Sequence, residues 1–178
     1  MRFIKDILLV QVETTGPDPD KDAIIQLAAV LLSKDNLLEK AVFNSYVRVS
    51  LLEGILSKHA ALLNIDPKIL QKSQKIYDVV KQFNQQFDSP LLLASHNTEA
   101  ILFLRNAYKK SLVPFEFDRH IIELWTLGYV YTLRYGMKKM PTFATFLQTF
   151  NLQQKNPHDA LEKCRLAAEI FKKIIKEA

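Results

Sequence analysis

Three apolar segments separated by short turns open the chain, and they constrain its fold more than any other feature. Residues 7–12, 23–32 and 41–49 are rich in the branched apolar residues that favour strands. Residues 17–20 and 34–36 lie between them and hold the Pro, Asp and Asn that are typical of turns. Because tight turns join antiparallel neighbours, this region predicts an antiparallel meander.

The rest of the chain has mainly helical patterns. The expected helices cover residues 53–63, 67–72, 76–87, 98–109, 121–133, 141–149 and 160–176. A short buried strand is expected at residues 91–94. A meander followed by helix–strand–helix units predicts a layered α/β domain with a mixed sheet. The length of 178 residues is enough for one domain with a hydrophobic core, so we expect a single domain over residues 1–178.

Composition is that of an ordinary soluble globular protein and excludes few functions. A net charge of +5 is compatible with a polyanionic partner and does not require one. The single cysteine, Cys164, excludes an internal disulfide and favours a reducing compartment. The apolar run at residues 7–10 is too short for a signal peptide or a membrane span. We therefore expect a cytoplasmic protein with no membrane association.

Polar motifs occur at three places where strands and helices meet. Residues 11–16 read Gln-Val-Glu-Thr-Thr-Gly, residues 96–104 begin with His-Asn, and residues 158–163 read His-Asp-Ala-Leu-Glu-Lys. In this order and spacing they resemble the motifs of the DEDDh-type 3′–5′ exonucleases, the RNase T and polymerase-proofreading type. The resemblance covers residues 8–171, almost the whole chain.

The resemblance implies both a fold and an activity. The fold would be RNase H-like, a mixed five-stranded sheet flanked by helices. The family hydrolyses a phosphodiester at a 3′ end with two divalent metals, four carboxylates and a general-base histidine. Hard divalent ions take oxygen ligands whose negative charge offsets their own. The histidine deprotonates the attacking water near neutral pH.

This chain departs from the family pattern at three of the four carboxylate positions. Those three positions hold Gln11, Ile101 and Lys163, and only Glu13 remains. Repulsion between a divalent ion and an ammonium group about 4 Å apart is roughly 8 kcal/mol at an effective dielectric of about 20. We therefore predict no metal at this site and no two-metal hydrolysis. We expect Lys163 to form an ion pair with Glu13 where the family holds its metals.

Other family positions are kept. His158 stands at the general-base position, where it would be vestigial without a metal-bound water. The family's Thr-Thr-Gly backbone touches the terminal nucleotide, so Thr14 and Thr15 are candidates for the same contact. His96 and Asn97 match the second motif, where they either contribute to substrate binding or order a strand-to-helix turn. Asn97 is also a plausible helix N-cap.

A neighbouring acid could replace a lost ligand. Asp159 is the strongest candidate because it lies four residues before Lys163 on the same predicted helix face. Asp159 also fits the N-cap of that helix, which is the role we favour. Glu99 and Glu162 lie about 200° and 100° round their helices from the family's ligand positions, so we expect neither to substitute.

Three functions remain open. The first is a non-catalytic module that binds a nucleic-acid 3′ end or another protein. The second is an active 3′–5′ exonuclease with atypical ligands, the only case in which Mg²⁺ or Mn²⁺ would be a cofactor. The third is a structural subunit of a replication or repair assembly.

Binding to single-stranded 3′ ends, if present, is expected to be weak and electrostatic. The basic residues available for it are scattered and include Lys109, Lys110, Lys138 and Lys139. Three aromatic residues could stack on bases, although their helical spacing favours packing: Trp125, Tyr129 and Tyr131.

Overall fold

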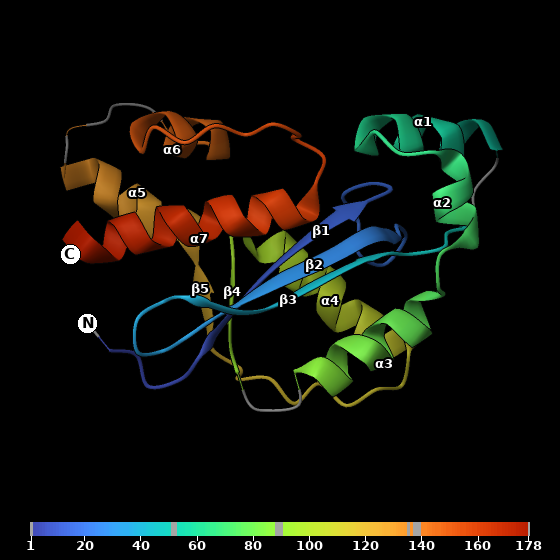
Figure 1. The fold of residues 1–178 in the computed structure, drawn as a ribbon, viewed down its shortest axis with the longest axis horizontal. Coiled ribbons are helices and arrows are strands. Elements are labelled where there is room, and N and C mark those ends of the chain that lie inside the picture. The colour runs from blue at the N-terminus through green and yellow to red at the C-terminus, as the bar shows by residue number, and fades with distance from the viewer. Residues whose placement is uncertain (1, 51–52, 88–90, 135, 137–139, 178) are drawn as a thin grey trace.

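A five-stranded mixed sheet forms the centre of the computed structural model, which describes residues 2–50, 53–87, 91–134, 136 and 140–177 (Figure 1). The strand order is β3-β2-β1-β4-β5. The strands are β1 (Ile7–Thr14), β2 (Ile24–Leu32), β3 (Glu39–Tyr46), β4 (Leu92–Ser95) and β5 (Ile121–Glu123). The helices are α1 (Glu53–Leu63), α2 (Pro67–Lys72), α3 (Ile76–Gln86), α4 (Thr98–Lys110), α5 (Leu124–Arg134), α6 (Phe143–Thr149) and α7 (Ala160–Glu177).

The predicted antiparallel meander is present. Strand β1 pairs antiparallel with β2, and β2 pairs antiparallel with β3. Strand β4 pairs parallel with β1, and β5 parallel with β4. The α/β fold with a mixed five-stranded sheet flanked by helices is therefore confirmed.

Alternation along β1 divides the core into two layers. Leu8 and Val10 belong to a cluster that includes residues of α3 and α4. Ile7 and Leu9 face the other way and pack with residues of α7. In Figure 1, α7 crosses one face of the sheet while α3 and α4 lie on the opposite side. Because strand side chains alternate, Gln11 continues the face toward α7.

Strand β5 corrects the sequence prediction, which placed residues 121–133 in one helix. Ile121 and Ile122 pair in parallel with Leu93 and Ala94, and α5 begins only at Leu124. A run of two isoleucines fits either a strand or a buried helix end, so local periodicity could not separate them. Residues 121–123 form a strand because the edge of β4 offers them backbone hydrogen-bond partners.

Other element boundaries differ from the prediction by one to three residues, and two of these differences have a visible cause. Strand β3 ends at Tyr46, because Val47 leaves the ladder to form an isolated bridge with Gln74. Helix α6 begins at Phe143, since the Thr142 hydroxyl accepts a hydrogen bond from the Thr145 backbone N–H and sets the N-cap there. Within the described ranges, no helix is both long enough and apolar enough to cross a membrane.

Candidate functional site

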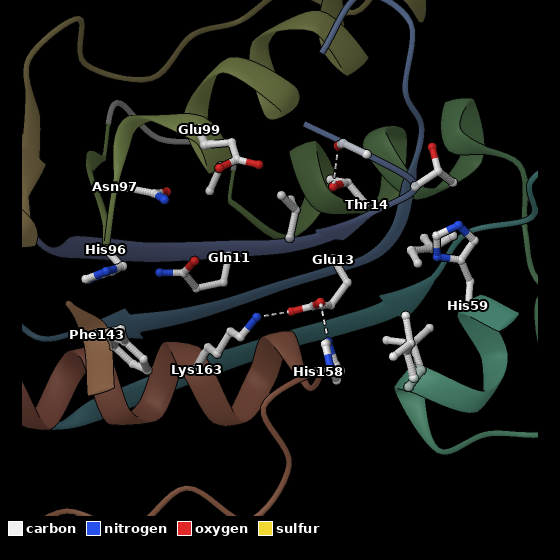
Figure 2. Close-up of a pocket in the computed structure, with 17 residues that line it drawn as sticks. Gln11, Glu13, Thr14, His59, His96, Asn97, Glu99, Phe143, His158 and Lys163 are labelled. Atoms are coloured by element: carbon white, nitrogen blue, oxygen red, sulfur yellow. Dashed lines mark hydrogen bonds and ion pairs between the residues drawn. The ribbon is translucent and has the colours of Figure 1, made fainter. Parts of the chain in front are cut away.

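A cavity of about 410 Å³ opens beside the carboxyl end of β1 (Figure 2). Strand β1 contributes Gln11 and Glu13, the turn between β4 and α4 contributes His96, and α7 with the loop before it contributes Lys163 and His158. Residues from all three sequence motifs therefore meet in one place, although up to about 150 positions separate them along the chain.

Glu13 is the centre of the cavity's ionic contacts. The Lys163 ammonium lies 2.5 Å from Glu13 Oε1, which is the contact expected from the sequence. His158 Nδ1 lies 3.7 Å from the other carboxylate oxygen. The side chains of Glu13 and Lys163 are 12% and 27% exposed. This carboxylate is thus already engaged by a fixed cation.

Gln11 places at the site a buried polar atom without a partner in the described part of the chain. It is only 6% exposed, and among the described residues its amide nitrogen Nε2 has no hydrogen-bond partner. Figure 2 shows this nitrogen pointing toward His96. A buried donor without a partner is unusual, because it costs the desolvation of the group and gains nothing in return.

Ile101 does not line the cavity. It is 1% exposed and packs in the core cluster between the sheet, α3 and α4. Glu99 lines the cavity instead, from the exposed first turn of α4. Ile101 is therefore a core residue and contributes nothing to the cavity.

The two threonines organise the turn after β1. The Thr14 hydroxyl donates to the Gly16 carbonyl at 2.7 Å, and the Thr15 hydroxyl accepts from the Ala23 backbone N–H at 3.0 Å. A β-carbon on Gly16 would lie 2.5 Å from the Asp22 carboxylate, so any larger residue here would have to displace that side chain. Both threonines line the cavity and hold its edge in place.

His96 is held in an aromatic setting. Its ring lies 4.6 Å from that of Phe143, edge to face. Burial lowers the pKa of His96 to about 4, and the nearby Lys163 acts in the same direction while Glu123 opposes it. Its imidazole is therefore neutral at physiological pH. The backbone carbonyl of His96 accepts a hydrogen bond from the Trp125 backbone N–H, which ties the turn after β4 to α5.

Asn97 occupies the predicted N-cap position of α4 without capping it. Its backbone is extended, yet its side chain makes no capping hydrogen bond. The Ser95 hydroxyl donates to the Asn97 carbonyl and orders the turn. The Asn97 side chain lines the cavity. The sequence therefore located the helix start correctly and the side-chain role incorrectly.

Asp159 caps α7, as expected. Its carboxylate accepts from the Leu161 backbone N–H at 3.0 Å and from the Gln26 side-chain amide at 3.0 Å. Glu162 accepts from the backbone N–H groups of Lys155 and Asn156, so it holds the preceding loop rather than completing a capping box.

Sequence reasoning missed several lining residues. His59 and Phe143 reach the cavity from α1 and α6, and no local pattern marks either one.

The aromatic residues of α5 pack elsewhere: Trp125 and Tyr129 stack on each other at 5.4 Å, and Tyr131 packs on Phe150. Lys138 and Lys139 fall outside the described residues, and Lys109 and Lys110 lie in the last turn of α4.

A mixed five-stranded sheet with these three motifs around one cavity is the arrangement of the RNase H-like 3′–5′ exonucleases. A family model for the RNase T exonucleases matches residues 10–171. The chain belongs to this family.

Two of the similar proteins carry the name of DNA polymerase III. The chain is 26% identical to the "DNA polymerase III PolC-type" of Bacillus subtilis over 96% of its own length and 11% of that protein. It is 27% identical to the "DNA polymerase III subunit epsilon" of Aquifex aeolicus over 96% of its length and 80% of that protein. The chain thus spans about a tenth of the length of its PolC-type relatives.

Solved nuclease structures share the fold. Cell-death related nuclease 4 superposes with a TM-score of 0.81 at 19% identity, covering 98% of this chain and 64% of that one. The nuclease domain of 3′hExo, a DEDDh family member bound to rAMP, gives 0.78 at 16% identity, covering 100% of this chain and 96% of that one.

Proposed function

We propose that this chain is a non-catalytic member of the exonuclease family that binds single-stranded nucleic-acid 3′ ends. The observation that carries the proposal is the contact between Glu13 and Lys163, which occupies the one family carboxylate that remains. An exonuclease with two metals needs that carboxylate free for an ion.

The donors at the site do not fit two divalent cations. Gln11 offers one neutral oxygen, Lys163 is a cation, and Ile101 lies in the core. Within the described part of the chain, no three His, Cys, Asp or Glu side chains are grouped so that they could hold a metal ion. Divalent ions require several negative oxygen ligands, so we derive no step that passes through a metal. Without a metal-bound water, His158 has no proton to remove, and its contact with Glu13 is a structural one.

Retention of the cavity supports binding. The Thr-Thr-Gly turn, His96 and Asn97 all line it, and none of these positions needs a metal to contact a nucleotide. The net charge of +5 also favours a polyanion. Contacts of this kind release counterions, so affinity should be weak and should fall steeply with salt.

The relatives support a second candidate, a structural subunit of a replicative polymerase or repair assembly. The similar proteins are parts of DNA polymerase III, and a chain with this fold could keep the protein contacts of such an assembly while losing catalysis. In this case a protein partner, and no nucleic acid, would bind.

A nuclease assay separates the proposal from an active enzyme. Purified protein is incubated with 5′-labelled single-stranded DNA and RNA in Mg²⁺ and in Mn²⁺, beside a Glu13→Ala variant purified in the same way. We expect equal traces of cleavage in both preparations, which is the signature of contaminating nuclease. Metal-dependent release of mononucleotides that disappears in Glu13→Ala would overturn the proposal.

A binding assay then separates the two non-catalytic functions. Fluorescence anisotropy of the same strands, at low and at physiological salt, should show salt-sensitive binding that does not depend on Mg²⁺. The absence of any binding at low salt would leave the structural subunit as the function.

A further inference from the structure

A second cavity, of about 200 Å³, adjoins the turn between β1 and β2. Residues 15 and 16 of that turn line the first cavity, while Pro19, Asp22 and Ala23 line the second. Its other walls come from the segment after β3, the start of α3 and the second half of α4. Both helices lie on the side of the sheet opposite α7 (Figure 1). The two cavities have no lining residue in common, so the second is separate from the candidate site.

The inner lining of the second cavity is mainly apolar. Ile24, Val47, Phe103 and Ala107 are buried there, and Ile76 is half-buried beside them. Cavities that enclose drug-sized ligands measure about 300–1,000 Å³, so this smaller one suits a single apolar side chain of a peptide. A leucine or phenylalanine seated here would remove apolar surface of both partners from water.

One side of the rim presents carboxylates whose contacts are internal to the protein. Asp22 accepts hydrogen bonds from the Thr15 hydroxyl at 3.2 Å and from the Asp18 backbone N–H at 2.9 Å. Lys110 donates to the Asp20 carbonyl at 3.1 Å, so its ammonium is held against the same turn. With three aspartates in residues 17–22, this side of the rim disfavours a polyanion.

Arg48 lies on the other side of the rim with an unpaired charge. Its backbone N–H donates to the Gln74 carbonyl at 2.8 Å, which holds the main chain in place. Its exposed guanidinium has no hydrogen-bond or ion-pair partner among the described residues. The backbone N–H groups of Val49 and Ser50 donate to no described residue either. A carboxylate at this position would find a free fork of guanidinium donors beside two free backbone donors.

We propose that the second cavity is a docking site for a peptide segment of a partner protein, in which an apolar side chain fills the cavity and a neighbouring carboxylate pairs with Arg48. Charge complementarity selects this occupant. A nucleic-acid strand repeats its negative charge along its length and would also meet the aspartates of residues 17–22. A single acidic side chain beside Arg48 avoids them, and the N–H groups of Val49 and Ser50 can donate to peptide carbonyls. This docking site goes beyond the nucleic-acid binding proposed for the first cavity.

An NMR titration of the isotope-labelled protein tests the site with defined probes. The probes are end-blocked hexapeptides of glycine and serine that carry one leucine or phenylalanine and one glutamate, placed next to each other or one residue apart. We expect the backbone signals of residues 47–50 and 103–110 to shift with at least one probe. Its affinity should fall about tenfold when alanine replaces the apolar residue and about threefold when glutamine replaces glutamate.

Substitutions in the protein separate the two halves of the contact. Arg48→Gln should weaken binding of the glutamate peptide about threefold and leave binding of its glutamine counterpart unchanged. Ala23→Phe places a ring at the exposed rim of the second cavity and should abolish binding of both peptides. Arg119→Gln and Ala61→Phe are matched controls at exposed positions that line neither cavity, so both should bind as the wild type does. A thermal melt of each variant excludes unfolding as the cause.

Three outcomes would overturn the inference, and each leaves the proposed function of the first cavity to its own assays. The first is that no probe shifts the signals of residues 47–50 and 103–110 up to its solubility limit. The second is peptide binding that is insensitive both to Arg48→Gln and to loss of the glutamate, since the charge would then select nothing. The third is that a short deoxythymidine strand shifts the same signals and Arg48→Gln abolishes this effect, which would identify a nucleic-acid contact instead.

Discussion

Removing the cation beside Glu13 should destabilise the protein by an amount that the geometry sets. Lys163→Met keeps the length of the side chain and removes its charge, which leaves a carboxylate that is 12% exposed without its 2.5 Å partner. Breaking a buried ion pair costs about 3–5 kcal/mol, and breaking an exposed pair about 0–1 kcal/mol. With Lys163 27% exposed, we expect about 2–3 kcal/mol. For a chain of this length that lowers Tm by about 4–12 °C.

A double-mutant cycle isolates the pair from other effects of substitution. Glu13→Gln combined with Lys163→Met removes both charges, so the double variant should recover most of the stability lost in Lys163→Met, with a coupling energy of about 2 kcal/mol. Chemical denaturation at neutral pH measures each free energy of unfolding. Lys21→Met breaks an exposed pair with Asp18, whose side chains are 84% and 37% exposed, and should cost less than about 0.5 kcal/mol. A Lys163→Met variant as stable as Lys21→Met would refute the reasoning.

Three further variants test other features of the structure. Gln11→Leu should raise the free energy of unfolding by about 1–2 kcal/mol, because it removes an unpartnered buried donor; a fall in Tm would show that the amide has a partner in the folded protein. Burial lowers the pKa of His96 to about 4 in the folded protein. As the pH falls, His96 is therefore protonated in the unfolded chain before it is protonated in the folded one. The free energy of unfolding therefore falls by about 2–3 kcal/mol as the pH is lowered from about 6.5 to about 4. Denaturation curves across this range should show a smaller fall for His96→Gln, and an unchanged fall for the control His120→Gln, which replaces an exposed histidine. Gly128→Ala should destabilise by about 1–3 kcal/mol in spite of its better helix propensity, because the new β-carbon would lie 2.4 Å from the buried Phe146 ring; a gain in Tm would show that α6 can move away.

Local patterns in the sequence determined the meander, most helices and the positions of the three motifs. Turn residues and strand periodicity act over a few positions, so they can be interpreted without knowing the partner strands. The capping role of Asp159 is equally local, since the accepting oxygen and the donating N–H of Leu161 lie two residues apart. The contact between Glu13 and Lys163 was predicted from the equivalence of both positions to family ligands that converge.

Tertiary structure alone decided the remaining features, because each depends on what lies opposite a side chain. Strand β5 exists since β4 offers it an edge, which the helix-like pattern of its residues did not reveal. Ile101 turns into the core because its apolar surface gains more from burial there than from facing a polar cavity. The unpartnered donor of Gln11 is also a property of packing, since only the surroundings in space show whether a buried amide has an acceptor.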